Sequence, residues 1–153
     1  MIEDPYRTPK AHLEAPSPYP ATRPREVKIA ALLIAVSVVI VFIAVAIATL
    51  GGRTKTELDV EDAAWPAVLL ILASQIFAGR NWSRWMFAVI VAFIAFAHVV
   101  MAFLLVTVPA TRAGFHWEVY ALGILQLMLQ VAAIVLAFSS RAGPWFTRPH
   151  PAG

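Results

Sequence analysis

The chain has 153 residues, and its 60% hydrophobic content exceeds the apolar share of about 45–50% that is usual in soluble domains. This excess predicts an integral membrane protein with a single domain. The absence of cysteine excludes a disulfide framework, a thiol nucleophile, an iron–sulfur cluster and a Cys-ligated zinc site. The net charge of +3 comes from basic residues in tails and short loops, so a nucleic-acid partner is not expected.

The first 27 residues carry six of the eleven prolines, mixed with charged residues and few aliphatic ones. Such a segment cannot bury a core, and it favours extended polyproline II conformations. We therefore expect residues 1–27 to form a disordered, Pro-rich cytoplasmic tail. Phosphorylation at Thr8 or Ser17, or docking of residues 16–20 on a partner, is an alternative to a plain leader.

Four apolar stretches follow, without any Asp, Glu, Lys or Arg: Ile29–Leu50, Ala63–Gly79, Trp85–Val108 and Val119–Phe138. A helix needs about 20 apolar residues to cross a membrane, so the second stretch lies at the short limit. We predict an all-α membrane protein, an antiparallel four-helix transmembrane bundle over residues 28–140 with spans at about 28–50, 63–79, 84–108 and 118–139. Pro66 is expected in the first turn of the second span, and residues 141–153 form a short cytoplasmic tail.

The distribution of basic residues predicts the orientation of the bundle, because Lys and Arg are enriched in cytoplasmic segments. With the N-terminus inside, nine of them lie on the inner side and three on the outer side. The inner set is Arg7, Lys10, Arg23, Arg25, Lys28, Arg80, Arg84, Arg141 and Arg148, and the outer set is Arg53, Lys55 and Arg112. Both termini are therefore expected in the cytoplasm.

Small and polar residues recur at steps of three and four along one side of each span, and helices in lipid pack through such residues. We expect four stripes to face one another. They are Ala30, Ile34, Ser37, Val41, Ala44 and Ala48; Ala67, Ile71, Ser74 and Ala78; Ala88, Ala92, Ala95 and Ala102; and Gly123, Gln126, Gln130, Ala133 and Ala137.

Five polar side chains lie at similar depth within the predicted spans: Ser74, Gln75, His98, Gln126 and Gln130. His98, nine residues before Thr107, lies roughly 13 Å below the outer interface at about 1.5 Å per residue. One interpretation is a structural hydrogen-bond cluster that holds three helices in register. The other is a proton-handling or ligand-binding site, because ionisable groups in a membrane are costly and histidine titrates near neutral pH.

The turn between the second and third spans combines arginines with tryptophans, which favour lipid phosphates and the headgroup region. We expect Arg80, Asn81, Trp82, Arg84 and Trp85, together with Trp145 behind the fourth span, to anchor the bundle to lipid, including anionic lipid, or to a partner. The string from Gly79 to Arg84, with Trp145-Phe146, resembles the G-R-N-W-x-R inner turn and terminal aromatic pair of small, uncharacterised bacterial four-span membrane proteins. The resemblance implies the topology and the bacterial inner membrane but no activity.

Catalysis finds no support in the sequence, since no nucleophile motif or metal-ligand pattern occurs and no carboxylate lies in any of the four apolar stretches. A haem with two histidine ligands is disfavoured because His98 is the only histidine deep in a span. No cofactor or metal is expected. The sequence favours a non-enzymatic accessory or scaffold subunit of a larger membrane complex, respiratory or envelope. The alternative is a small homo-oligomeric transporter or channel that uses the polar cluster around His98.

Overall fold

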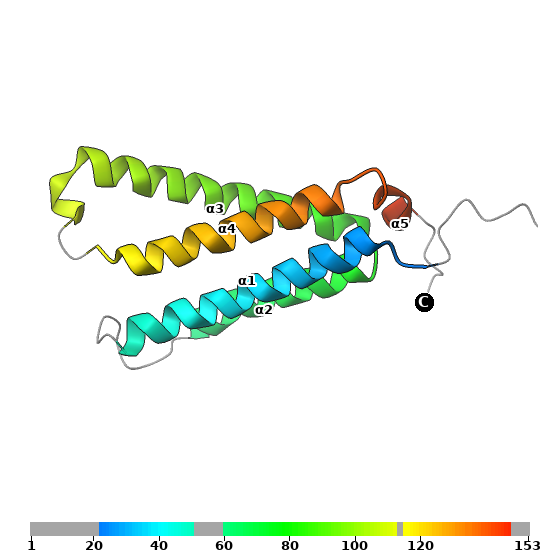
Figure 1. Cartoon of the computed structure of the whole chain (residues 1–153), viewed down its shortest axis with the longest axis horizontal. Coiled ribbons are helices and arrows are strands. Elements are labelled where there is room, and N and C mark those ends of the chain that lie inside the picture. The colour runs from blue at the N-terminus through cyan, green and yellow to red at the C-terminus, as the bar shows by residue number, and fades with distance from the viewer. Residues whose placement is uncertain (1–21, 51–59, 113–114, 148–153) are drawn as a thin grey trace, which may run out of the picture.

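The computed structural model describes residues 22–50, 60–112 and 115–147, and this part of the chain is helical, without a strand (Figure 1). In order, the elements are α1 (Arg25–Leu50), α2 (Val60–Phe77), α3 (Asn81–Thr107), the 3-10 helix η1 (Pro109–Arg112), α4 (Trp117–Ala137) and α5 (Gly143–Thr147). Most of residues 1–27 lie outside the described residues, so the expectation of a disordered tail is not addressed there.

Three helices, α1, α3 and α4, are long and apolar enough to cross a membrane, and α2 contributes a shorter apolar stretch, Ala64–Phe77. The chain thus fits a multi-pass helical membrane protein. The helices run side by side in an elongated bundle, with the α2–α3 turn and α5 at one end and η1 at the other (Figure 1). We call these the turn end and the η1 end.

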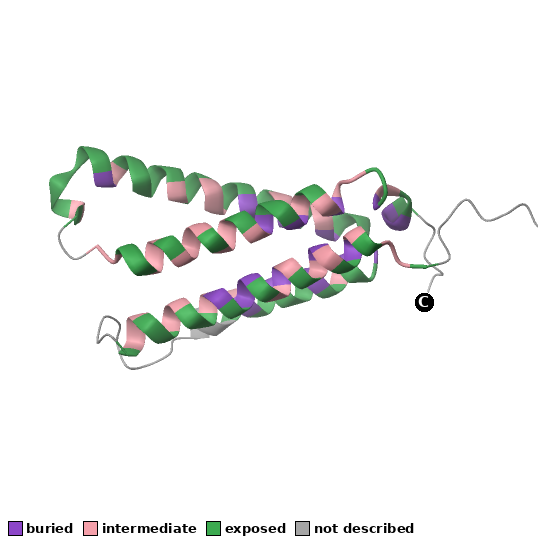
Figure 2. Cartoon of the chain, in the orientation of Figure 1, coloured by how far each residue is buried: buried purple, intermediate pink, exposed green. Residues whose placement is uncertain are grey.

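The core follows α1, which packs most extensively on α4 and next on α2. The small-residue stripes of the first and fourth spans are confirmed where these helices meet: Ala30, Ile34 and Ser37 are buried in α1, and Gln130, Ala133 and Ala137 in α4. Short side chains let the two backbones approach closely. Figure 2 shows this burial concentrated toward the turn end of the bundle.

The stripes expected in the second and third spans are wrong. Ala67, Ile71, Ser74 and Ala78 are all exposed, and in α3 Ala92 and Ala102 are exposed while Ala88 and Ala95 are half-buried. Larger side chains take their place, namely Leu69, Leu72 and Ile76 in α2 and Phe87, Val91 and Leu105 in α3. These helices therefore pack mainly through bulky apolar side chains, beside the buried Ala73 of α2 and Ser83 of α3.

The start of α2 also differs from the expectation. The helix begins at Val60, so Pro66 lies inside it rather than in its first turn. Its end is set by Gly79, whose φ of +83° lies in the left-handed region that favours glycine. The Gly79 N–H donates to the Ile76 carbonyl at 3.0 Å and the Arg80 N–H to the Gln75 carbonyl at 3.0 Å. These two bonds form a Schellman motif, which reverses the chain within a few residues before α3 begins.

Candidate functional site

The imidazole of His98 lies where α3 meets α4. Its Nδ1 is 2.9 Å from the Ile94 carbonyl oxygen, which can only accept, so Nδ1 is the donor of this hydrogen bond. The Tyr120 hydroxyl donates to the His98 carbonyl at 3.2 Å, and the two rings lie 5.6 Å apart. A Cβ atom at Gly123 would stand 3.0 Å from Nε2, so α4 makes room for this ring with a glycine.

A second polar contact joins α4 to α1. The Gln130 side-chain Nε2 donates to Ser37 Oγ at 3.4 Å, and the Ser37 hydroxyl donates in turn to the Ile34 carbonyl at 2.8 Å. Both side chains are fully buried. The Gln130 Oε1 is also buried and makes no hydrogen bond within the described residues. A buried acceptor without a partner carries a desolvation cost of about 1–3 kcal/mol.

The remaining predicted polar residues lie apart from these two contacts. Ser74 is exposed on α2, and its hydroxyl donates to the Ile71 carbonyl of its own helix at 2.7 Å. Gln75 and Gln126 are half-buried. Within the described part of the chain, no hydrogen bond joins any two of the five side chains expected to form one cluster.

Three contact residues, Ser37, Tyr120 and Gly123, were missing from the cluster expected from sequence. Ser37 and Gly123 carried a signal, because each lies in a small-residue stripe on the face that proves to be buried or packed. Tyr120 carried none, since an interfacial aromatic residue is ordinarily assigned to lipid. The polar groups thus make separate contacts and do not form one hydrogen-bonded cluster.

At the turn end, the residues expected to anchor the bundle have different surroundings. Arg80 and Asn81 are exposed, and the Trp82 and Trp85 side chains are 49% and 57% exposed. Trp85 also packs edge-on against Phe138, with ring centroids 4.8 Å apart. These four residues can reach lipid or a partner.

Arg84 is half-buried and has aromatic neighbours from the C-terminal part of the chain. Its guanidinium lies 4.9 Å from the Phe138 ring centroid and 5.0 Å from that of Phe146. A guanidinium within about 6 Å of an aromatic face is attracted by the ring quadrupole. Arg84 therefore ties α3 to the segment that follows α4.

Trp145 differs from the expectation of an interfacial anchor, because it is only 4% exposed. Its ring covers Gly79, where a Cβ atom would stand 2.6 Å from Trp145 Nε1. Arg23, which precedes α1, places its guanidinium 3.5 Å from the Phe77 ring centroid and 5.4 Å from that of Trp145. The short helix α5 thus folds back over the turn end and closes its apolar core.

The surface of the turn end is basic. Arg25, Lys28, Arg80 and Arg141 are exposed there. Arg141 is paired with Glu26 at 3.5 Å, but its side chain is 83% exposed, so this ion pair contributes little stability. Such a surface attracts anionic headgroups.

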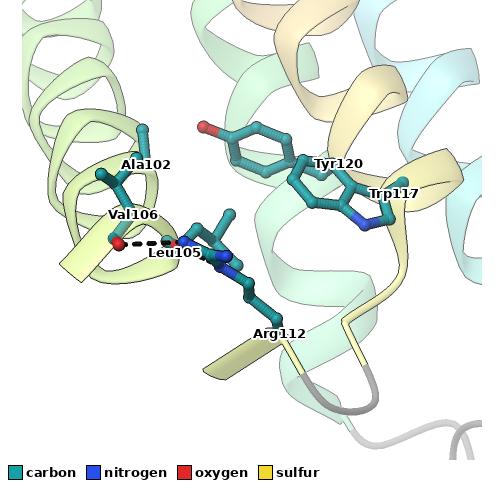
Figure 3. Close-up of a pocket in the computed structure, with 6 residues that line it drawn as sticks. All are labelled: Ala102, Leu105, Val106, Arg112, Trp117 and Tyr120. Carbon is teal, nitrogen blue, oxygen red and sulfur yellow. Dashed lines mark hydrogen bonds between the residues drawn. The ribbon is translucent and has the colours of Figure 1, made fainter. Parts of the chain in front are cut away.

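The η1 end holds a pocket of about 440 Å³, which Figure 3 shows between the end of α3, η1 and the start of α4. Its lining residues are Ala102, Leu105, Val106, Arg112, Trp117 and Tyr120. Arg112 donates from Nε to the Leu105 carbonyl at 2.6 Å and from Nη2 to the Val106 carbonyl at 3.0 Å. These bonds satisfy carbonyls in the last turn of α3, which lack partners within the helix.

In the described ranges, no group of three His, Cys, Asp or Glu side chains is placed to hold a metal ion. Comparison with known proteins gave no matching family model, no matching curated protein and no matching solved structure.

Proposed function

We propose that the chain is a non-enzymatic accessory or scaffold subunit of a larger membrane complex, respiratory or envelope, in the bacterial inner membrane. The observation that supports this most directly is how the polar groups within the helices are used. The Ser37, Ser74 and Thr107 hydroxyls and His98 Nδ1 all bond to carbonyls three or four residues back in their own helix. A conducting path needs polar groups that face a shared aqueous route, whereas these groups stabilise helices and their contacts.

The proposal includes four crossings with both termini in the cytoplasm. The basic surface of the turn end supports this orientation, because positive charge is retained on the cytoplasmic side. The resemblance of the Gly79–Arg84 turn to small bacterial four-span proteins points the same way. Arg80, Asn81, Trp82 and Trp85 then lie at the inner interface, where they contact lipid or a partner subunit.

The outward face of α3 supports a docking role. Only Ser83, Phe87, Val91 and Leu105 are buried among its residues, fewer than in α1 although the two helices are of similar length. Its exposed face carries large rings at helical spacing, with Phe93 75%, Phe96 63% and Phe103 63% exposed. We propose that a partner's transmembrane helix packs on this ridge, since aromatic rings provide a large contact area.

Purification in a mild detergent, followed by native mass spectrometry, tests the proposal. Unrelated partner chains should co-purify, and a Phe96→Ala variant should lower their occupancy. Phe42→Ala on α1 is the matched control, because Phe42 is 54% exposed on a different helix and should leave the complex intact. Recovery of monomers or homo-oligomers alone would contradict the subunit role.

A homo-oligomeric transporter or channel is the second candidate, and the unpaired Gln130 Oε1 is the observation in its favour. This acceptor and His98 Nε2 are the groups on which a proton or polar solute would depend. If this function holds, His98→Ala and Gln130→Leu abolish a measured flux in liposomes while the fold is retained. A flux in both variants equal to that of the parent chain would contradict a pathway through these two residues.

A further inference from the structure

We propose that the pocket at the η1 end binds an anionic phospholipid, with the phosphate on Arg112 and the upper part of an acyl chain between α3 and α4. The inference needs only that the bundle lies in a membrane, and it is independent of any subunit role. It concerns the membrane interface at the η1 end. The lipid anchors expected from the sequence lie at the opposite end, the turn end.

The position of the pocket sets its depth. Ala102, the lining residue furthest from the end of α3, lies five residues before Thr107, or about 7.5 Å at 1.5 Å per residue. The pocket therefore begins at the interface and reaches into the first part of the hydrocarbon region. Trp117 and Tyr120 are the residue types that occupy this level of a bilayer.

The charge of the pocket sets the ligand's headgroup. Arg112 is the one charged residue among the six that line it, and two of its donors hold it against the end of α3. Its Nη1 group makes no hydrogen bond within the described residues. A guanidinium held in place, with free N–H groups, recognises phosphate oxygens strongly. The site therefore prefers a headgroup whose net charge is negative.

The apolar walls of the pocket indicate that the other part of the ligand is a hydrocarbon chain. The side chains of Ala102, Leu105 and Val106 are apolar, and the Tyr120 hydroxyl is already engaged with the His98 carbonyl at 3.2 Å. Water at this depth would find few partners on such walls. A hydrocarbon chain attached to an anionic group satisfies both ends of the pocket at once, and a phospholipid supplies both parts.

Photo-crosslinking tests the site. The full chain is placed in phosphatidylcholine nanodiscs with a trace of phosphatidylglycerol that carries a diazirine near the top of one acyl chain, and the labelled residues are mapped by mass spectrometry. We expect label on the pocket residues, and a loss on the order of tenfold in Arg112→Gln, as removal of a charge-assisted phosphate contact implies. A diazirine phosphatidylcholine should label these residues more weakly.

A second pair of variants tests the pocket without touching the arginine. Ala102→Leu should fill the space and remove the label, whereas Ala92→Leu, at an exposed alanine of α3 outside the pocket, should label as the parent chain does. Equal labelling by both lipids, or full labelling of Arg112→Gln and Ala102→Leu, would overturn the proposal. Loss of label in excess inorganic phosphate would also overturn it, because the occupant would then be the free ion.

Discussion

The Gln130 amide donates to the Ser37 hydroxyl across 3.4 Å and so joins α4 to α1 at a point where both side chains are fully buried. This contact lies in the most extensive helix interface of the bundle. It is asymmetric, because Nε2 has a partner while Oε1 has none within the described residues. Ser37→Ala and Gln130→Leu each remove this hydrogen bond, and they should therefore lower the free energy of unfolding by different amounts.

Ser37→Ala should lower the free energy of unfolding by about 0.6–1.7 kcal/mol, because it leaves the Gln130 amide without its partner. Gln130→Leu should cost less, since it also removes the unpaired Oε1. Equilibrium unfolding in mixed detergent measures both, and the double variant gives the coupling energy. Additive costs would show that the 3.4 Å contact contributes nothing.

Gly79→Ala should destabilise the bundle by at least 1–2 kcal/mol, about the cost of a left-handed conformation for a residue with a Cβ. The added methyl group would also meet Trp145 Nε1 at 2.6 Å and displace α5. Gly143→Ala is the matched control, because a Cβ there meets nothing within 4 Å. Thermal unfolding of the two variants distinguishes them, and equal midpoints would contradict the packing of Trp145 on this turn.

Gly123→Ala should push His98 away from α4, since the new Cβ would stand 3.0 Å from Nε2. We expect a cost of about 1 kcal/mol, at the low end for overpacking, because the imidazole can shift by a few tenths of an ångström. In a His98→Ala background the same change should be nearly neutral. If Gly123→Ala lowers stability by the same amount in the His98→Ala background, the glycine is needed for a reason other than the space that the imidazole takes.

Arg84→Gln should lower stability by about 1 kcal/mol through loss of the guanidinium stacked near Phe138 and Phe146. Arg80→Gln removes the same charge from an exposed side chain four residues earlier, and it should stay within about 0.5 kcal/mol of the parent chain. Equilibrium unfolding in mixed detergent at matched ionic strength compares the stabilities of the two variants. Similar losses would indicate a general charge effect instead of a specific aromatic contact.

The helical, membrane-type architecture was predictable because hydrophobic length alone determines it. The predicted spans were at about 28–50, 63–79, 84–108 and 118–139. The four observed helices overlap these spans, and each begins one to three residues before the predicted start. Helix starts extend into the polar flanks, as the apolar limits of a stretch do not mark where backbone hydrogen bonds begin. The apolar composition gave no sign of α5, whose five residues are held by tertiary contacts of Trp145 and Phe146.

The candidate site was harder to predict, because depth does not determine the direction in which a side chain points. Ser74 was expected in a polar cluster because of its depth in the predicted span, yet its side chain is exposed on α2. Small residues predicted the α1–α4 contact but failed for α2 and α3, since abundant alanine makes stripes on several faces of a helix. The pocket beside Arg112 depends on how the ends of α3 and α4 diverge around η1, which no local pattern encodes.

The proposed function depends on four crossings with cytoplasmic termini, and the cysteine-free sequence allows a direct test with single cysteines. Four variants each replace an exposed residue. Thr22→Cys, Asn81→Cys and Ser140→Cys lie at the turn end, and Ala110→Cys lies at the η1 end. In intact cells, a membrane-impermeant maleimide should label only the cysteine at position 110, and all four should react after the cells are opened. Labelling at positions 81 and 140 with protection at 22 and 110 would mean that α2 does not cross. Labelling at 22, 81 and 140 with protection at 110 would mean that the bundle is inverted, and either result would contradict the proposed topology.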